Sequence, residues 1–275
     1  MVWKHKSPAI IHVPAEALDK YGNPRIGGGC PSPHRMMMAA SAGGAFTPDA
    51  AVSDGTNDYM LRGGDLTGNA NGSNGLLSCW VRFNGDDGLL QYFMQNTGGY
   101  FSFAKTAYNK IELKGWAGAT NVIGLVGDTS IVADSTWRHI AASWNGTSSH
   151  LYLDGVAEGG FNSPNSGSID YTRANWYICS NSDGGQTLHA DISELYFALE
   201  YLDISDASEL EKFRSSGGEA VDLGSDGSTP TGNQPIIYCH LPDGGTADTE
   251  FNNQNGSGGT YTVYGSFGET DGPNG

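Results

Sequence analysis

The stretch that decides the fold is Ser135–Gly155, which reads STWRHIAASWNGTSSHLYLDG. Its first half alternates with a period of two residues, so Ile140, Ala142 and Trp144 share one face of a strand while the residues between them face the other way. This alternation is typical of a strand with one face in a hydrophobic core. We therefore expect a β-strand that ends near Trp144.

A turn and a returning strand follow directly. Asn145-Gly146 is a dipeptide that tolerates positive φ and is a common hairpin signal. Beyond it, Leu151 and Leu153 point to one face and Tyr152 to the other. The stretch therefore predicts a β-hairpin within a larger antiparallel sheet.

This hairpin resembles the laminin-G-type, concanavalin A-like jelly rolls. The resemblance rests on residues that occur in the family's order: Trp137, His139, Ala141, Trp144, Gly146, Leu151, Tyr152, Asp154 and Gly155. It extends from about Asp54 to Phe213. The resemblance implies an all-β fold, namely an antiparallel two-sheet jelly-roll sandwich with one short helix and extended terminal arms.

Three regions follow from composition and pattern. We expect an N-terminal docking arm over residues 1–36, a jelly-roll domain over 37–217, and a linker with a C-terminal β extension over 218–275. Glycine makes up 41 of 275 residues without a Gly-X-Y period, which favours many short strands joined by tight turns. No apolar run is long enough to span a membrane, and the first residues lack the pattern of a secretory signal.

Charge separates the arm from the rest of the chain. Residues 1–36 carry five basic and two acidic side chains, a net charge of +3, whereas the remaining residues carry nine basic and 28 acidic side chains, a net charge of −19. An acidic body argues against nucleic acid as a partner. The proline-rich basic arm indicates an attachment segment, with Trp3, Lys4 and Lys6 as its candidate docking residues.

Strand patterns recur every ten to twelve residues along the chain, as in a sandwich. The predicted strands are Leu76–Phe83, Leu89–Gln95, Tyr100–Ala104, Lys110–Lys114, Asn121–Val126, Trp176–Cys179, Ala190–Leu199, Ile236–Leu241 and Thr260–Tyr264. One helix is expected after Asp206, which forms a capping box with Glu209 and precedes the apolar Leu210 and Phe213.

The four cysteines, Cys30, Cys79, Cys179 and Cys239, are far apart and include no CxxC pair. This spacing gives no support for a zinc site. Cys79 and Cys179 lie in strand patterns, where buried free thiols are expected, with a disulfide as the alternative.

No catalytic residues are predicted. Asp191 and Glu194 are three residues apart in a strand, which places them on opposite faces. Two carboxylates on opposite faces cannot act together as a glycosidase pair. The Glu-x-Asp-x-x-Glu string of the laminarinase-like branch of the fold is absent, and so is the Gly-x-Ser-x-Gly elbow of serine hydrolases. His139 is interpreted as a structural histidine.

No metal site or cofactor is predicted, although relatives of this fold often bind calcium. Asp54, Asn57 and Asp58 lie together in one loop, and Asn181 and Asp183 in another. The favoured interpretation is turn formation, because Asn and Asp side chains hydrogen-bond the nearby backbone in such loops.

Aromatic residues on loops can stack on the apolar face of a sugar. Tyr108 and Trp116 are the candidate carbohydrate-binding residues because neither fits an inward strand position, and Asn181 and Asp183 are added as polar candidates. Trp80, Trp137, Trp144 and Trp176 are expected in the core.

Together these features favour a non-enzymatic structural component of a bacteriophage particle: a fibre, spike or decoration protein with a lectin-like module for host surface glycans. Residues 235–275 resemble tails that follow laminin-G-like modules in tailed-phage virion proteins. We expect the protein to fold in the host cytoplasm, to join the virion in several copies through its arm, and to bind other virion proteins but neither nucleic acid nor membrane. A bacterial surface or secreted lectin and a glycoside hydrolase are the alternatives.

Overall fold

A computed structural model describes residues 46–160, 162–164 and 167–275. The described residues form one compact unit, which contains the predicted jelly roll from residue 46 onward together with the C-terminal extension. The predicted arm, with Trp3, Lys4 and Lys6, lies outside the described residues, as does Cys30.

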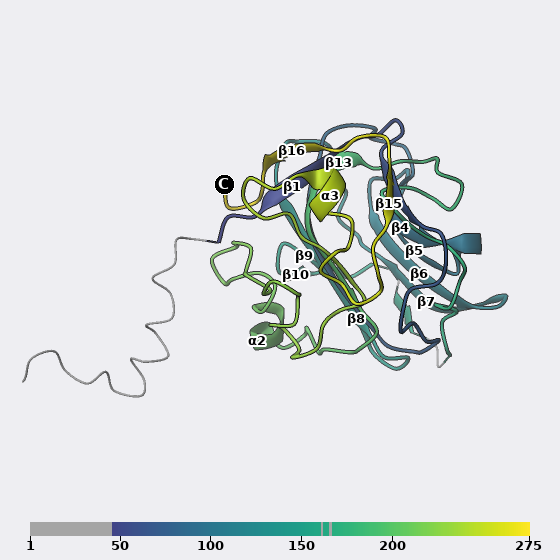
Figure 1. Cartoon of the computed structure of the whole chain (residues 1–275). Helices are drawn as coiled ribbons and strands as arrows, with labels where there is room; N and C mark the ends of the chain where they lie inside the picture. Colours follow the sequence, from purple (N-terminus) through teal and green to yellow (C-terminus); the bar gives the residue numbers. More distant parts are fainter. Residues whose placement is uncertain (1–45, 161, 165–166) are drawn as a thin grey trace, which may run out of the picture. The chain divides into compact units, whose positions relative to one another are not determined.

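Two antiparallel sheets make up the fold, as predicted, and Figure 1 shows them as two layers. The first sheet is ordered β10 (Val156–Ala157), β9 (Ser149–Leu153), β8 (Arg138–Trp144), β3 (Gly75–Phe83), β13 (His189–Ala198), β1 (Asp49–Asp54) and β16 (Gly268–Asp271), and β14 (Ile237–Cys239) also pairs with β13. The second sheet is ordered β11 (Asn162–Pro164), β7 (Thr120–Val126), β6 (Ile111–Ala117), β5 (Phe101–Lys105), β4 (Gln91–Asn96), β12 (Trp176–Ile178), β2 (Tyr59–Arg62) and β15 (Thr262–Tyr264).

The main core lies between the inner faces of the two sheets. On β8, Ile140, Ala142 and Trp144 are buried in it, and β9 adds Leu151 and Leu153. The alternation of the hairpin is thus confirmed. Burial of each large apolar side chain contributes roughly 1.5–3 kcal/mol, so this alternation stabilises one register of the hairpin.

The hairpin turn differs from expectation in one detail. Gly146 has positive φ, but Asn145 does not, and its side chain instead accepts hydrogen bonds from the backbone N–H groups of Thr147 and Ser148 at 3.1 and 2.8 Å. Asn145 therefore stabilises the turn as an acceptor.

A second hydrophobic layer covers the outer face of the first sheet. It combines Leu76, Ala141 and Tyr196 from strands with residues that follow β13, among them Leu210 and Phe213. In Figure 1 this segment, with α2 (Ala207–Leu210), lies outside that sheet. These residues therefore cover much of the outer face of the first sheet.

The predicted helix starts where expected but is shorter. The Asp206 side chain caps it by accepting from the N–H of Ser208 at 2.9 Å, and α2 ends at Leu210, before Phe213. Two further short elements were not predicted: α3 (Ala247–Glu250) and a 3-10 turn, Thr97–Gly99.

The segment after residue 217 adds strands to both sheets. β14 pairs with β13, β16 with β1, and β15 with β2. The C-terminal strands therefore complete the sandwich.

One strand departs from strict alternation, and this corrects a prediction. The register of β13 against β3 shifts between Ser193 and Tyr196, and Glu194 has φ of 53°. This β-bulge inserts one residue into β13. As a result, neither Asp191 nor Glu194 points into the core between the sheets, and the prediction that they lie on opposite faces is wrong.

Two of the four tryptophans expected in the core lie elsewhere. Trp144 and Trp176 are in the main core, but Trp80 packs on the outer face against His139, and Trp137 lies before β8, half-buried beneath the Arg82 guanidinium. Trp80 follows the alternation of β3, which places it opposite Cys79 and Val81.

The remaining core predictions concern thiols and a histidine. Cys79 and Cys179 are buried free thiols, as predicted, and so is Cys239. His139 is fully buried; its Nε2 pairs with Ser78 Oγ at 2.9 Å, and burial together with the charge of Arg214 lowers its pKa to about 3. It is therefore neutral at ordinary pH, in keeping with a structural role.

Within the described residues, no helix is both long and apolar enough to cross a membrane.

Candidate functional site

Loops from both sheets meet at one end of the sandwich. In the first sheet Asp54 pairs with His189, and in the second sheet Gln91 pairs with Lys105. The N–H of His189 donates to Oε1 of Gln91 at 2.9 Å, so these strand ends of the two sheets lie side by side. We call this region the rim site and define it by residues 55–56, 84–90, 106–110 and 186–189.

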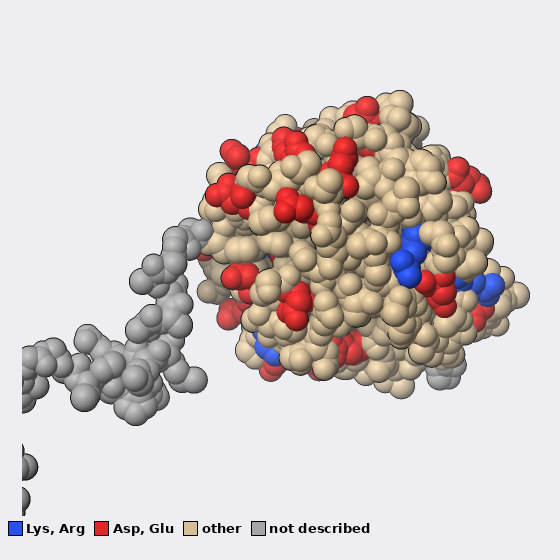
Figure 2. All heavy atoms as spheres, in the orientation of Figure 1, with Lys and Arg blue, Asp and Glu red and all other residues tan. Residues whose placement is uncertain are grey.

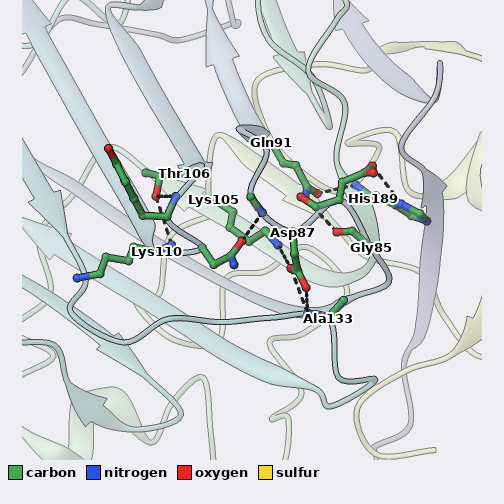
Figure 3. Close-up of polar contacts among 12 residues, drawn as sticks. Gly85, Asp87, Gln91, Lys105, Thr106, Lys110, Ala133 and His189 are labelled. Atoms are coloured by element: carbon green, nitrogen blue, oxygen red, sulfur yellow. Dashed lines mark hydrogen bonds and ion pairs between the residues drawn. The ribbon is translucent and has the colours of Figure 1, made fainter.

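A buried lysine stabilises the base of the rim site. Lys105 is 0% exposed; its Nζ lies 2.8 Å from Asp87 Oδ1 and 4.6 Å from the centre of the Phe83 ring. The hydrogen bond from Lys105 holds the pKa of Asp87 below its usual value, and the N–H of Ala133 also bonds this carboxylate. Figure 3 shows Lys105, Asp87 and Ala133 converging. A buried cation needs such a partner, so this pair fixes the β3–β4 loop.

Gln91 braces the other side of that loop. Its Nε2 donates to the carbonyl groups of Gly85 and Asp86 at 3.1 and 2.9 Å, and its Oε1 accepts from the N–H of His189 at 2.9 Å. Nδ1 of His189 in turn lies 3.1 Å from Asp86 Oδ2. One buried amide thus links the β3–β4 loop to the start of β13, and Figure 3 shows Gln91 between Gly85 and His189.

A tight turn between β5 and β6 presents the most exposed aromatic ring at this end. Oγ1 of Thr106 accepts from the N–H groups of Tyr108 and Lys110 at 3.2 and 3.3 Å, and Asn109 adopts φ of 58°. The Asn109 side chain also accepts from the N–H of Gly88 at 2.9 Å, which ties the turn to the β3–β4 loop. Tyr108 is 83% exposed, so a well-anchored turn carries a free ring.

A pocket of about 310 Å³ lies beside the β3–β4 loop. Its lining combines the backbone and side chains of three loops: Gly55, Thr56, Asp86, Leu89, Leu90, Gln91, Gln186 and Thr187. Leu89 is 58% exposed at its edge. A pocket with an apolar edge and a few fixed polar groups is typical of sites for small ligands.

The structure separates the predicted sugar-binding residues. Tyr108 is at the rim site, whereas Trp116 is half-buried in β6 near the β6–β7 turn, at the opposite end of that strand. Asn181 and Asp183 lie in the β12–β13 loop, which also supplies Gln186 to the pocket. No single site contains both Tyr108 and Trp116.

The polar candidates form turns, as the favoured interpretation predicts. Asn181 Oδ1 accepts from the N–H groups of Asp183 and Gly185 at 3.1 and 2.9 Å. In the β1–β2 loop, Oδ1 of Asp54 accepts from the N–H of Thr56, and Asp58 accepts from the backbone of Asp54 and Ser266. Across the described part of the chain, no cluster of three or more His, Cys, Asp or Glu side chains could hold a metal ion.

Neither the Asp86–His189 pair nor the contacts of Gln91 could be predicted from the sequence. The three residues come from two distant segments, and only the turn-rich string NGDDG, Asn84–Gly88, marks the loop on which Asp86 lies.

The two sheets and the loop-built rim define a lectin-like β-sandwich. The chain belongs to the concanavalin A-like lectin/glucanases superfamily, whose laminin-G-type family model matches residues 54–200. No curated protein sequence matches the chain significantly.

The chain is similar to several solved structures at low sequence identity. A Bacteroides ovatus ATCC 8483 protein, described as a candidate carbohydrate-binding protein, is 12% identical with a TM-score of 0.60; the match covers 82% of this chain and 60% of that one. A heptameric pentraxin from Limulus polyphemus is 15% identical with a TM-score of 0.46, covering 59% of this chain and 81% of that one. Domain 4 of a Geobacillus stearothermophilus arabinanase, solved with arabinotriose, is 17% identical with a TM-score of 0.44, covering 58% and 75%.

Proposed function

We propose that this protein is a carbohydrate-binding module that binds glycans at the rim site. The observation that carries the proposal is Tyr108, whose ring is 83% exposed on a turn held by Thr106 and Asn109. A rigid, exposed ring can stack on the apolar face of a pyranose without first being ordered. The likeness to the Bacteroides ovatus protein, described as carbohydrate-binding, supports the same class of ligand.

We propose further that the module is not an enzyme. Both carboxylates considered as a glycosidase pair are engaged in fixed contacts: Asp191 accepts from Arg82 and Asn84 at 2.6 and 2.7 Å, and Glu194 from Tyr238 at 2.6 Å. Both side chains are buried. General acid–base catalysis of glycoside cleavage needs two carboxyl groups facing the bond, and these two face structural partners.

The wider role we propose is that of a structural component of a bacteriophage particle, present in several copies. The support is the proline-rich, basic segment 1–36 ahead of an acidic body, and the resemblance of residues 235–275 to tails in phage virion proteins. Figure 2 shows carboxylates spread over the visible face of the body with few basic groups among them. A basic segment suits attachment to acidic surfaces of neighbouring subunits.

A bacterial surface or secreted lectin is the second candidate. It would use the same rim site, and the superfamily assignment supports carbohydrate binding without supporting a place on a phage particle. Native mass spectrometry or micrographs of the purified source particle separate the two: a phage component is found in fixed copy number on the particle.

A glycan array of bacterial capsules and lipopolysaccharides, read with and without calcium, tests the binding function. We expect the wild-type protein to bind a subset of glycans, Tyr108→Phe to bind the same subset, and Tyr108→Ala to lose it. Trp116→Ala, at the other end of β6, is the control and should keep the wild-type pattern. No binding by wild-type protein to any bacterial glycan would overturn the proposal.

A further inference from the structure

Asp86 lines the rim pocket, and its carboxylate is bonded to His189. Asp86 comes from the β3–β4 loop and His189 from the first position of β13, 103 residues apart in the chain. Their side chains are partly exposed, 39% and 32%, so they are accessible to a ligand while still bonded to one another.

Two glycines hold this pair in place from opposite sides. A Cβ on Gly55 would lie 2.7 Å from His189 Cβ and 2.8 Å from Asp86 Oδ2, and one on Gly85 would lie 2.7 Å from His189 Nδ1. Any larger residue at either position would push the imidazole away from the carboxylate. The close fit therefore fixes the positions of the carboxylate and the imidazole relative to one another.

The bond between the two groups determines what they offer a ligand. His189 Nδ1 is bonded to one oxygen of the Asp86 carboxylate, and the carboxylate keeps further acceptor positions. Acceptors of this kind recognise donors, and sugar hydroxyl groups are such donors. The apolar edge at Leu89 suits the C–H face of the same ring.

The charge around the pocket limits the kind of sugar. Asp54 precedes the pocket residue Gly55, and Asp87 follows Asp86; the nearby cation Lys105 is buried and already paired with Asp87. The described residues that line the pocket include the carboxylate of Asp86 and no Lys or Arg, so a carboxylated sugar bound there would place like charges together.

We infer that the rim pocket is the hydrogen-bonding subsite of the glycan site, that the Asp86–His189 pair binds sugar hydroxyl groups there, and that the ligand is an uncharged glycan. This inference rests on the proposed function and adds to it the chemical class of the ligand and the residues that select it.

The test compares two β-1,4-linked polysaccharides that form a neutral and acidic pair and differ in a C6 carboxylate, mannan and polymannuronate. Wild-type protein should bind the neutral member of the pair at least about tenfold more tightly. Asp86→Asn should weaken binding of the neutral member by about tenfold or more, because it removes a charged acceptor. It should also bring the affinities for the neutral and the acidic member closer together. Asp243→Asn removes an equal charge from the exposed loop after β14 and is the matched control.

The outcomes separate the two claims. Preference of wild-type protein for the uronate member, or equal effects of Asp86→Asn and Asp243→Asn on a glycan that still needs Tyr108, would overturn the inference and leave the proposed function standing. Failure of the wild-type protein to bind any glycan would overturn both the inference and the proposed function. Thermal melts of each variant establish that the loss of binding is not a loss of folding.

Discussion

Gly75 and Trp144 form a tight pair at the end of the sandwich opposite the rim site. They face one another across β3 and β8, and a Cβ on Gly75 would lie 2.0 Å from Cζ2 of the Trp144 ring. Trp144 is 1% exposed, and its Nε1 donates to the Tyr171 hydroxyl at 3.0 Å. The ring thus occupies the space that a side chain at position 75 would need.

This geometry predicts strong coupling between two substitutions. Trp144→Ala should cost about 3–5 kcal/mol through lost burial and a cavity, a large share of the roughly 5–15 kcal/mol that stabilise a domain. Gly75→Ala should cost about 1–3 kcal/mol because the new methyl group collides with the ring. In the double variant the collision is absent, so the second cost should vanish and leave a coupling energy of about 1–3 kcal/mol.

Urea unfolding followed by far-ultraviolet circular dichroism measures all four proteins without depending on tryptophan fluorescence. The pair Gly75→Ala with Tyr152→Thr is the control, because Tyr152 lies on the outer face of the hairpin and its effect should add to that of Gly75→Ala. Additive costs for Gly75→Ala and Trp144→Ala, within about 0.5 kcal/mol, would show that the ring does not lie over Gly75. A larger loss from Tyr152→Thr than from Trp144→Ala would show that the two faces are assigned the wrong way round.

The pKa of His240 is raised above the ordinary 6.5. Burial by itself would lower this pKa, but the bond to Glu194 at 2.5 Å and the charge of that carboxylate outweigh the effect of burial. The stability contributed by this pair should therefore be fully present below pH 6.5 and be lost as the pH rises through the raised pKa. The check is the free energy of unfolding of wild type and Glu194→Gln as a function of pH. Equal slopes of that free energy against pH in the two proteins would contradict the prediction. Asn145→Val should lower stability by about 1 kcal/mol in thermal melts because it removes the turn's acceptor, and an unchanged melting temperature would refute that role. Deletion of residues 1–36 should leave a folded protein that no longer joins its particle, whereas normal copy number would show that docking lies elsewhere. Removal of calcium with a chelator should leave the melting temperature unchanged, because loop carboxylates such as Asp58 already accept backbone N–H groups.

Local alternation was sufficient to predict most of the sandwich. Leu77, Cys79, Val81 and Phe83 do share the inner face of β3, because period-two burial follows from strand geometry alone. The bulge at Glu194 could not be predicted in this way, since the partners of its side chain, Tyr238 and His240, lie 44 and 46 residues later in the chain.

The candidate site was predictable only in part. Tyr108 could be identified because it fits no inward strand position and follows turn-forming residues. The pocket could not, because Gly55, Asp86 and Gln186 come from three separate loops that meet only through strand pairing. Trp116 fits no inward position either, yet it lies within a strand at a register shift, which alternation does not reveal.

The measurement that most directly tests glycan binding at the rim site is a calorimetric titration with the strongest glycan of the array. Wild-type protein, Tyr108→Phe and Tyr108→Ala are compared, all with unchanged melting temperatures because Tyr108 is exposed. We predict that Tyr108→Phe keeps the wild-type affinity to within about threefold and that Tyr108→Ala weakens it by about tenfold or more, as loss of a stacking ring requires. Wild-type affinity in Tyr108→Ala would contradict the proposal that this protein binds glycans at the rim site.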